Sequence, residues 1–447
     1  PGVWRAGLAE QRPLSGTGDS LTWGFFYVGS ERVSYVTQST LVVDLSLEFD
    51  VPQAVVLGVD STYEILYYGT PMAPLWRRTA GLADLVTAAM ADQDQAFAQG
   101  GAYDRALLAE LAAAGGAEYA ELCALARRQI VGGTVAVWNN VTQEEWAFMK
   151  EISSDGDVST VDVLFPAFPF FMYEAPRFLR KMLLPLLDYA MNRTAQYGLD
   201  IRYNLSWAPH HLGVWPIADL RPEDQEQMPM EESGNMLLMI AGLLKARPSD
   251  GVAWLAPYWD VLKTWADFIV ASLPDPANQL CTDDFEGPSP HNANLAAKGF
   301  CALAAYSQLL KAGGFPEWQA YHTLAENFTQ QWVHLAEGQP SQRQLNGTGS
   351  PTWSQKYNLM FDRVLGLGLL PDDWYAREEA AYASKLERYG VPLDDRHPYT
   401  KSDESLLLAA VLSDAYFHKV VHATWLFANN TPDLVPLSDW HDVRTAR

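Results

Sequence analysis

The sequence predicts a mainly α-helical protein: an (α/α)6 barrel of six helical hairpins, preceded by the C-terminal strands of a truncated β-sandwich. Three observations support this fold class. Apolar residues alternate up to about residue 75, they follow a helical period from about residue 76 onward, and no strand pattern separates the successive helices. Ten or more helices without interleaved strands exclude a Rossmann or TIM-barrel architecture. The sequence has no evident fixed-period repeat, which argues against a solenoid. We therefore divide the chain into a β-domain remnant, 1–75, and a catalytic barrel, 76–447.

The first 75 residues contain short runs rich in β-branched and aromatic residues, with Gly, Asp, Ser and Pro between them. Such runs are typical of antiparallel strands. The expected strands are 21–28, 33–37, 41–49, 53–59 and 64–68. Five strands make a poor independent sandwich. We therefore expect the missing portion of this β domain to have been cut away or to remain as a second chain, an N-terminal β-sandwich fragment of the same precursor.

The remainder of the chain is rich in Ala and Leu at helical spacing, and loops carrying Pro, Gly and Asp separate the periodic segments. The expected helices are 81–99, 103–130, 175–192, 231–246, 253–272, 292–313, 316–337, 372–388, 403–415 and 418–428.

Charge and composition exclude several classes of protein. The 447 residues carry a formal net charge of −23, which argues against binding to nucleic acid, because that binding depends on a basic surface. No apolar run reaches the roughly 18 residues of a membrane span, so no membrane partner is expected. The sequence contains no Walker, GxGxxG or GxSxG motif and no CxxC spacing, so we expect no cofactor and no metal. Three cysteines do not make a disulfide framework, although one bridge between Cys281 and Cys301 stays open.

Glycosylation sequons indicate the compartment. Chance predicts roughly one Asn-x-Ser/Thr sequon in this composition, yet the chain has six. They begin at Asn140, Asn192, Asn204, Asn327, Asn346 and Asn429. This excess favours a secreted glycoprotein, located extracellularly or in a cell wall. The alternative is a bacterial chain with a chance excess.

Carboxylates cluster where predicted helices begin. The clusters are Glu231-Glu232, Thr282-Asp283-Asp284 and Lys401-Ser402-Asp403. Each cluster alone is explained by helix capping. In a ring of helices, however, the N-termini of the inner layer share one face, so the clusters can meet in one acidic funnel suited to acid/base hydrolysis.

Other polar residues lie in apolar or aromatic surroundings and are candidates for burial: Asp162, the pair His210-His211, and Asp362-Arg363, which we interpret as a structural ion pair. The histidine pair lacks HExxH-type spacing, which argues against a metal site.

Most of the 16 Trp are expected in the core. Trp207, Trp215 and Trp353 are the better candidates for a sugar subsite, because each lies in a motif-rich loop.

Several long segments, in order from about residue 145 to the C-terminus, carry a resemblance to a known family. They include Thr160-Val-Asp-Val-Leu-Phe-Pro, Ala208-Pro-His-His-Leu-Gly-Val-Trp-Pro, Met228-Pro-Met-Glu-Glu-Ser-Gly-Asn-Met, Cys281-Thr-Asp-Asp-Phe-Glu-Gly and Lys356-Tyr-Asn-Leu-Met-Phe-Asp-Arg. The sequence resembles the secreted fungal glutaminase A-type family and its bacterial relatives. The resemblance implies a β-sandwich followed by an (α/α)6 barrel, and hydrolysis of glutamine to glutamate and ammonia.

A more distant similarity, to retaining β-glucosidases of the bile-acid β-glucosidase type, bears on mechanism. Glu151 and Asp162 reproduce the eleven-residue spacing between that group's nucleophilic Glu and a following Asp. Thr282 and Asp284 match its acid/base motif, so the resemblance implies Glu151 as nucleophile and Asp284 as acid/base. His211 departs from the pattern, since both groups usually have Asp there. Pro288 and Glu404 depart too, which puts substrate preference in doubt.

Three hypotheses follow. The first is a glutaminase-type amidohydrolase in which Lys401 or Arg396 holds the α-carboxylate of the substrate. The second is a retaining β-glycosidase with its two carboxyls about 5–5.5 Å apart. The third is a non-catalytic glycan-binding module, whose polar loops would face solvent separately. The expected partner is a small-molecule substrate, an amino acid or a sugar. The predicted substrate-binding residues are Asp162, His210, His211, Trp215, Glu231, Glu232, Thr282, Asp283, Arg396, Lys401 and Asp403.

Overall fold

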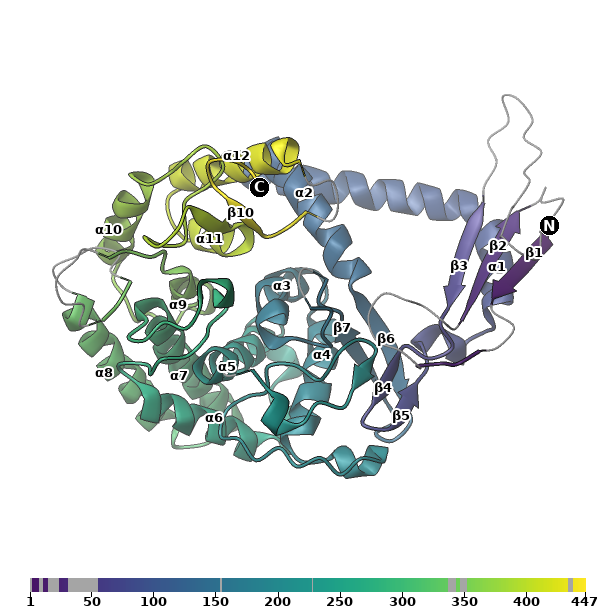
Figure 1. The fold of residues 1–447 in the computed structure, drawn as a ribbon, viewed down its shortest axis with the longest axis horizontal. Coiled ribbons are helices and arrows are strands. Elements are labelled where there is room, and N and C mark those ends of the chain that lie inside the picture. Colours follow the sequence, from purple (N-terminus) through teal and green to yellow (C-terminus); the bar gives the residue numbers. More distant parts are fainter. Residues whose placement is uncertain are drawn as a thin grey trace.

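Helices form most of the protein, as the sequence predicts. A computed structural model describes residues 2–7, 11–14, 24–30, 55–152, 155–226, 228–336, 343–345, 352–432 and 437–447. In Figure 1 the helices from α3 onward are arranged in a ring, and a small β-sheet stands apart from this ring at the far end of the long helix α2. The mainly helical fold class is therefore confirmed.

The small sheet joins β1 (Gly2–Gly7), β2 (Phe25–Ser30) and β3 (Val56–Asp60), in antiparallel order β1-β2-β3. One face packs on α1 (Leu82–Ala91), where Val86 and Met90 form a small core with Tyr27. The predicted strands at 21–28 and 53–59 correspond to β2 and β3, whereas β1 was not predicted. The predicted strands at 33–37 and 41–49 lie outside the described residues.

The last predicted strand, 64–68, belongs to a sheet shared with the helical part of the chain. β4 (Ile65–Tyr67) pairs with β5 (Thr70–Met72) and, in parallel, with β8 (Ile217–Ala218). The buried Tyr67 also donates a hydrogen bond of 2.8 Å to the backbone oxygen of Pro185. This segment is thus bound to the helical part, while the domain division at residue 75 stays a prediction.

α2 (Gln93–Gly132) is a long helix with a sharp bend at Gly116, whose φ is +87°. The segment after the bend packs on α12 (Asp414–Asn430), where Trp425 Nε1 donates to Glu121 Oε2 at 2.7 Å. Figure 1 shows the segment before the bend leading away toward β3. The predicted break at residues 100–102 is wrong, because the chain continues as a helix through this Gly-rich stretch.

Two elements that the sequence did not predict precede the rest of the ring. The hairpin of β6 (Thr134–Asn139) and β7 (Glu144–Met149) is followed by α3 (Val161–Glu174). α3 contains Pro166 and Pro169, residues that disfavour a helix interior. Its burial explains why it forms, since Leu164 and Phe168 are completely inaccessible to solvent.

The remaining helices are α4 (Pro176–Ala190), α5 (Pro229–Ala246), α6 (Trp259–Ser272), α7 (Ala293–Gly313), α8 (Trp318–Ala336), α9 (Met360–Leu365), α10 (Asp372–Ala383) and α11 (Ser402–Ala409). Two short strands, β9 (Tyr399–Lys401) and β10 (Trp440–Asp442), form an antiparallel pair near the C-terminus. α5 and α7 are buried along most of their length and pack against each other.

Among the described helices, none combines the length and the apolar character that crossing a bilayer requires. Cys123, Cys281 and Cys301 are free thiols, which answers the open question of a bridge.

Candidate active site at the helix N-termini

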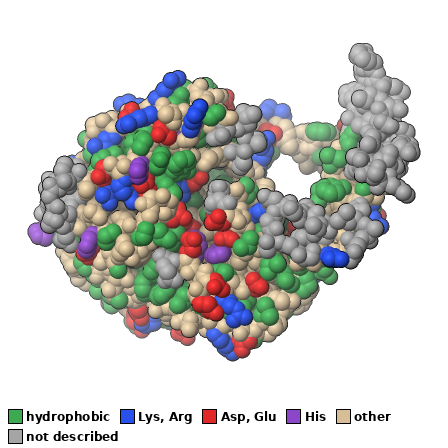
Figure 2. All heavy atoms as spheres, in the orientation of Figure 1, with side chains coloured by type: hydrophobic (Ala, Val, Ile, Leu, Met, Phe, Trp, Pro, Cys, Tyr) green, Lys and Arg blue, Asp and Glu red, His purple; other side chains and the backbone are tan. Residues whose placement is uncertain are grey.

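Acidic side chains from the first turns of different helices gather in one region of the ring. α3 supplies Asp162, α5 supplies Glu231 and Glu232, and α11 supplies Asp403 and Glu404. Figure 2 shows Asp, Glu and His side chains gathered near the centre of the visible face of the ring. No N-cap residue of these three helices makes a side-chain capping bond. The expected meeting of the helix N-termini is supported, because carboxylates from three helices gather there; Asp403 also accepts hydrogen bonds from backbone N–H groups of its own first turn.

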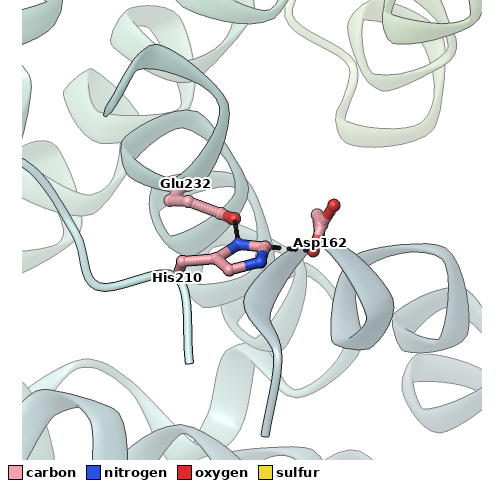
Figure 3. Close-up of side chains that lie close together, drawn as sticks. All are labelled: Asp162, His210 and Glu232. Atoms are coloured by element: carbon pink, nitrogen blue, oxygen red, sulfur yellow. Dashed lines mark hydrogen bonds and ion pairs between the residues drawn. The ribbon is translucent and has the colours of Figure 1, made fainter. Parts of the chain in front are cut away.

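The centre of the site is a buried histidine between two carboxylates (Figure 3). Nδ1 of His210 is hydrogen-bonded to Oε1 of Glu232 and lies 3.6 Å from Oδ1 of Asp162. Nε2 of the same ring lies 3.4 Å from a carboxylate oxygen of Glu226. The backbone fixes the ring, because the His210 N–H donates to Oε1 of Gln225 at 2.7 Å and the His210 carbonyl accepts from the first residue of α3. Asp162, His210 and Glu232 are each at least nine-tenths buried.

This burial and the close charges determine the proton distribution. Desolvation raises the pKa of Asp162 to about 6, although His210 opposes the shift. Burial by itself would lower the pKa of His210, but Asp162 and the hydrogen-bonded Glu232 outweigh it and raise the pKa to about 10. Burial and the neighbouring Asp162 raise the pKa of Glu232 to about 8. The cluster therefore holds protons that can move near neutral pH.

Next to this cluster lies a buried ion pair that the sequence analysis missed. Nζ of Lys298, on α7, pairs with Oε1 of Glu231 and donates to Oδ1 of Asn235 at 2.6 Å. The amide of Asn235 in turn donates to both Glu231 and Glu232, at 3.1 Å each. Lys298 also lies 4.2 Å from the ring centroid of Phe165. The signal was a single lysine within the apolar segment 293–305.

A second cluster joins the loop before α7 to β9 and α11. Nζ of Lys401 lies 3.2 Å from Oγ1 of Thr282 and 3.4 Å from a carboxylate oxygen of Asp439. Tyr357, which sequence reasoning did not assign to the site, donates to Oδ2 of Asp283 at 2.9 Å. Burial raises the pKa of Asp283 to about 6, against the opposing effect of Lys401.

The two clusters interact electrostatically. Burial lowers the pKa of Lys401, but four carboxylates, Asp162 among them, raise it well above its usual range. Burial also raises the pKa of Glu404 and of Asp403, with Lys401 opposing both shifts. The structure thus brings most of the predicted acidic residues within electrostatic reach of one another.

The predicted nucleophile and acid/base lie in different environments. Glu151 is buried, and its Oε2 accepts a hydrogen bond of 2.7 Å from Oγ1 of Thr160, the N-cap of α3. Asp284 is exposed on the short 3-10 helix η6 (Asp284–Glu286) and accepts from the backbone N–H of Phe285 at 2.7 Å. Their assignment as a catalytic pair stays a prediction.

Other predicted substrate-binding residues are already engaged by the protein. Nδ1 of His211 lies 3.0 Å from a carboxylate oxygen of Asp157. Trp215 is half-buried and packs on the main core. Arg396 is paired with Asp394 and also donates to the Glu286 backbone oxygen at 3.1 Å.

The expected ion pair between Asp362 and Arg363 is wrong. Arg363 pairs instead with Asp372 at 2.7 Å, and the Asp362 carboxylate accepts from two backbone N–H groups and from the hydroxyl of Tyr375. Successive residues on a helix point in different directions, which explains why the pair does not form.

The side chains of Asp162, His210 and Glu232 also meet a geometric requirement for a cation site, since their donor atoms lie within 4.8 Å of one another. A ligating histidine must offer a neutral nitrogen to the metal. Here Nδ1 is committed to Glu232, and the raised pKa keeps the ring protonated near neutral pH. We therefore interpret the cluster as a site of proton chemistry, and the expectation of no metal stays a prediction.

Several buried carboxylate oxygens have no hydrogen-bond donor among the described residues. They are Asp162 Oδ1, Glu231 Oε2, Asp283 Oδ1, Asp403 Oδ1 and Glu404 Oε2. A buried acceptor without a donor is costly. The site is therefore suited to a ligand with several N–H or O–H donors.

Comparisons with known proteins agree with this architecture. Residues 116–447 match the family described as the glutaminase A six helical-hairpin domain. The chain is 35% identical to glutaminase A of Aspergillus oryzae over 342 residues, which cover 74% of this chain and 47% of that protein. It is 26% identical to a probable glutaminase of Arthroderma benhamiae over 458 residues, covering 83% and 52%. The chain thus spans about half the length of these curated relatives.

The solved structures that superpose on this chain have lower sequence identity to it than these relatives do. A protein named as a wild-type glycosidase superposes with a TM-score of 0.45 at 15% identity, covering 69% of this chain and 81% of the other. A GH76 α-mannanase of Bacteroides thetaiotaomicron gives a TM-score of 0.40 at 11% identity, covering 73% and 90%.

Proposed function

The chain belongs to the glutaminase A six helical-hairpin family, and from this premise we propose that it is a hydrolase that converts L-glutamine to L-glutamate and ammonia. The observation that carries the proposal is the buried cluster of Asp162, His210 and Glu232. Amide hydrolysis requires a base to activate water and an acid to protonate the departing nitrogen. The cluster supplies groups for both tasks.

The roles follow from the proton distribution. Asp162, with a pKa of about 6, is largely ionised at neutral pH, and its Oδ1 has no donor in the described structure. It takes a proton from water as the water oxygen bonds to the side-chain carbonyl carbon of glutamine. The protonated His210, held by Glu232, then donates its proton to the amide nitrogen as the C–N bond breaks and ammonia leaves.

The second cluster is suited to the amino-acid end of the substrate. Lys401 is the predicted partner of the α-carboxylate, and its raised pKa keeps it charged. Oδ1 of Asp283, buried without a donor among the described residues, suits the α-ammonium group, and Glu404, whose raised pKa keeps it protonated, adds a neutral acceptor through Oε2. Arg396 is less suited to the α-carboxylate than Lys401, because it donates two hydrogen bonds to Asp394, at 2.8 and 2.5 Å, whereas the Asp439 carboxylate lies 3.4 Å from Lys401.

The direct test measures ammonia release from glutamine by the purified chain and by Asp162→Asn. Asp260→Asn is a matched control, because Asp260 also lies in the first turn of a helix, α6, but is exposed. The proposal requires that Asp162→Asn loses activity while Asp260→Asn keeps it. An unmodified chain that is folded and releases no ammonia contradicts the proposal.

A retaining β-glycosidase is the second candidate, and one observation favours it. Glu151 is buried and oriented by the Thr160 hydroxyl, as a nucleophile must be, and sugar hydroxyls would satisfy the unpartnered carboxylate oxygens. The test is cleavage of aryl β-glucosides by the unmodified chain and by the variants Glu151→Gln and Asp284→Asn. Glycosidase activity that survives in both variants excludes this carboxylate pair.

The non-catalytic hypothesis receives less support. It expects polar loops that face solvent separately, yet Asp162, His210 and Glu232 come from three segments and converge in the interior.

A further inference from the structure

A cavity of about 330 Å³ lies at the other end of α5 from the carboxylate site. It is open to solvent and is lined by the hairpin of β6 and β7, the N-terminal part of α4, the C-terminal end of α5 and the loop after α5; the hairpin and the two helices lie beside one another in Figure 1. Leu243, in its wall, is twelve residues after Glu231 on the same helix. Twelve helical residues span about 18 Å, so the cavity is separate from the carboxylate site.

The charges of this cavity differ from those of the whole chain. Four basic residues line it, Arg177, Arg180, Lys181 and Arg247, together with three acidic ones, Glu144, Glu145 and Asp250. The surplus is one positive charge in a chain whose formal net charge is −23. The cavity also adjoins the N-terminus of α4, where the helix dipole favours an anion.

Most of these charges are already paired, but Arg180 is not. Asp250 lies 3.4 Å from Arg177 and 3.3 Å from Arg247, which lower its pKa, and Lys181 pairs with Glu145. Among the described residues Arg180 has no carboxylate partner. Its guanidinium instead lies 5.1 Å from the ring centroid of Trp254.

The walls also provide what a sugar ring requires. Trp138 and Trp254 both line the cavity, with Arg78 over the Trp138 ring and Arg180 over the Trp254 ring, and the indole surface that remains can pack against the C–H face of a pyranose. Glu144 is a carboxylate acceptor for sugar hydroxyls and has no ion-pair partner among the described residues. A cavity of about 330 Å³ falls at the small end of ligand pockets and suits a ligand of one or two rings.

We propose that this cavity is a second binding site, for a uronic acid: a pyranose whose carboxylate pairs with Arg180, whose ring lies against Trp254, and whose hydroxyls donate to Glu144. A neutral sugar would form no ion pair with the exposed guanidinium of Arg180, and a simple inorganic anion would make no apolar contact with the indoles. The site does not depend on the reaction proposed for the carboxylate cluster.

The experiment is isothermal titration calorimetry of the full chain with glucuronate, and with glucose as the ligand that lacks the carboxylate. We expect glucuronate to bind at least 10-fold more tightly than glucose. Arg180→Gln should weaken glucuronate binding at least 10-fold, while Arg180→Lys should retain part of it. Lys263→Gln controls for overall charge, since Lys263 is an exposed residue of α6 and should leave the affinity unchanged.

Asp162→Asn separates the two sites. It should leave glucuronate binding unchanged, whereas Arg180→Gln should leave the activity of the carboxylate site unchanged. The proposal is overturned if glucuronate does not bind, if glucose binds equally well, or if Lys263→Gln weakens binding as much as Arg180→Gln. Loss of binding in Asp162→Asn would place the sugar in the carboxylate site instead and would also overturn it.

Discussion

Oδ1 of Asp162 lies 3.6 Å from Nδ1 of His210, just beyond hydrogen-bonding distance. The imidazole is committed to Glu232, so this aspartate oxygen is attracted to the histidine charge without receiving its proton. The histidine charge offsets part of the desolvation of this carboxylate, which still has a lone pair available for water. The relationship between these two residues is the basis of the proposed general base.

Replacing Asp162 tests this role. Asp162→Asn keeps the shape of the side chain but removes the base, so kcat for glutamine should fall by about 10²–10⁴-fold. KM should change much less, because the proposed substrate contacts lie on Asp283, Lys401 and Glu404. Steady-state ammonia release measures both constants. Circular dichroism must show an intact fold, and an unchanged kcat would refute the assignment.

The acidic limb of the pH–rate profile should report Asp162. The base is ionised above its pKa of about 6, so kcat/KM should decline below pH 6. At high pH the His210–Glu232 pair loses its proton, and the rate should decline again, with the limits set by pKa values of about 8 and about 10. A profile that stays flat between pH 5 and pH 7 contradicts this assignment.

Stability should change with pH in the opposite direction over the acidic range. The folded-state pKa of Asp162, about 6, is above its ordinary value of 3.8, so its contribution to stability is fully present below pH 3.8 and is lost as the pH rises through 6. A shift of this size corresponds to about 3 kcal/mol. The free energy of unfolding of the unmodified chain should therefore decrease relative to that of Asp162→Asn between pH 4 and pH 7. Urea denaturation at several pH values measures the difference, and Asp260→Asn, which retains Asp162, should follow the unmodified chain.

Lys298 should be essential to the fold of the site. Lys298→Met leaves Glu231 buried without its counter-ion, and the loss of one partner of a buried pair costs about 3–5 kcal/mol. The double variant Lys298→Met with Glu231→Gln removes both charges and should recover part of this loss. Thermal or urea unfolding compares the three proteins. A single variant as stable as the unmodified chain would show that the pair contributes little.

We also propose that the protein is secreted and glycosylated, and the structure distinguishes among its sequons. Asn140, Asn204 and Asn327 are exposed, so these three should carry glycans when the chain is expressed in a secreting eukaryotic cell. Asn192 should not, because its side-chain amide donates to the Tyr203 backbone oxygen and its oxygen accepts from the Tyr203 N–H.

Glycopeptide mass spectrometry identifies the occupied sequons. Asn429 is exposed, but its amide donates to the Trp425 backbone oxygen within α12, so we expect partial occupancy there, and Asn346 lies outside the described residues. Full occupancy of Asn192 together with an unmodified Asn140 would contradict the proposal.

Periodicity and capping patterns were enough to predict the fold class and the meeting of acidic helix N-termini. The sequence could not reveal the partner of Lys298, because a lone lysine on an apolar helix finds its counter-ion only through tertiary packing against α5. α3 was missed for a related reason. Its two prolines lower local helix propensity, and the burial that compensates for them comes from contacts distant in sequence.

Local sequence patterns also could not predict which candidate residues form ion pairs within the protein or which of them are exposed. Arg396 looked like a free cation in the sequence, but Asp394, two residues away, forms a salt bridge with it. Asp284 was predicted as the acid/base and Asp283 as a substrate-binding residue, yet the chain turns between them, so that Asp284 is exposed and Asp283 is buried.

α2 bends at Gly116, so a substitution at this residue would measure the conformational cost of the bend. Its φ of +87° is unfavourable for any L-residue, yet an added methyl group would meet no neighbouring atom within 4 Å. Because the alanine methyl group would clash only with its own stretch of backbone, its cost would be the intrinsic conformational preference of the chain. If α2 straightens to relieve this cost, its segment before Gly116 must change direction. A single methyl group would then move the sheet of β1, β2 and β3 relative to the ring of helices.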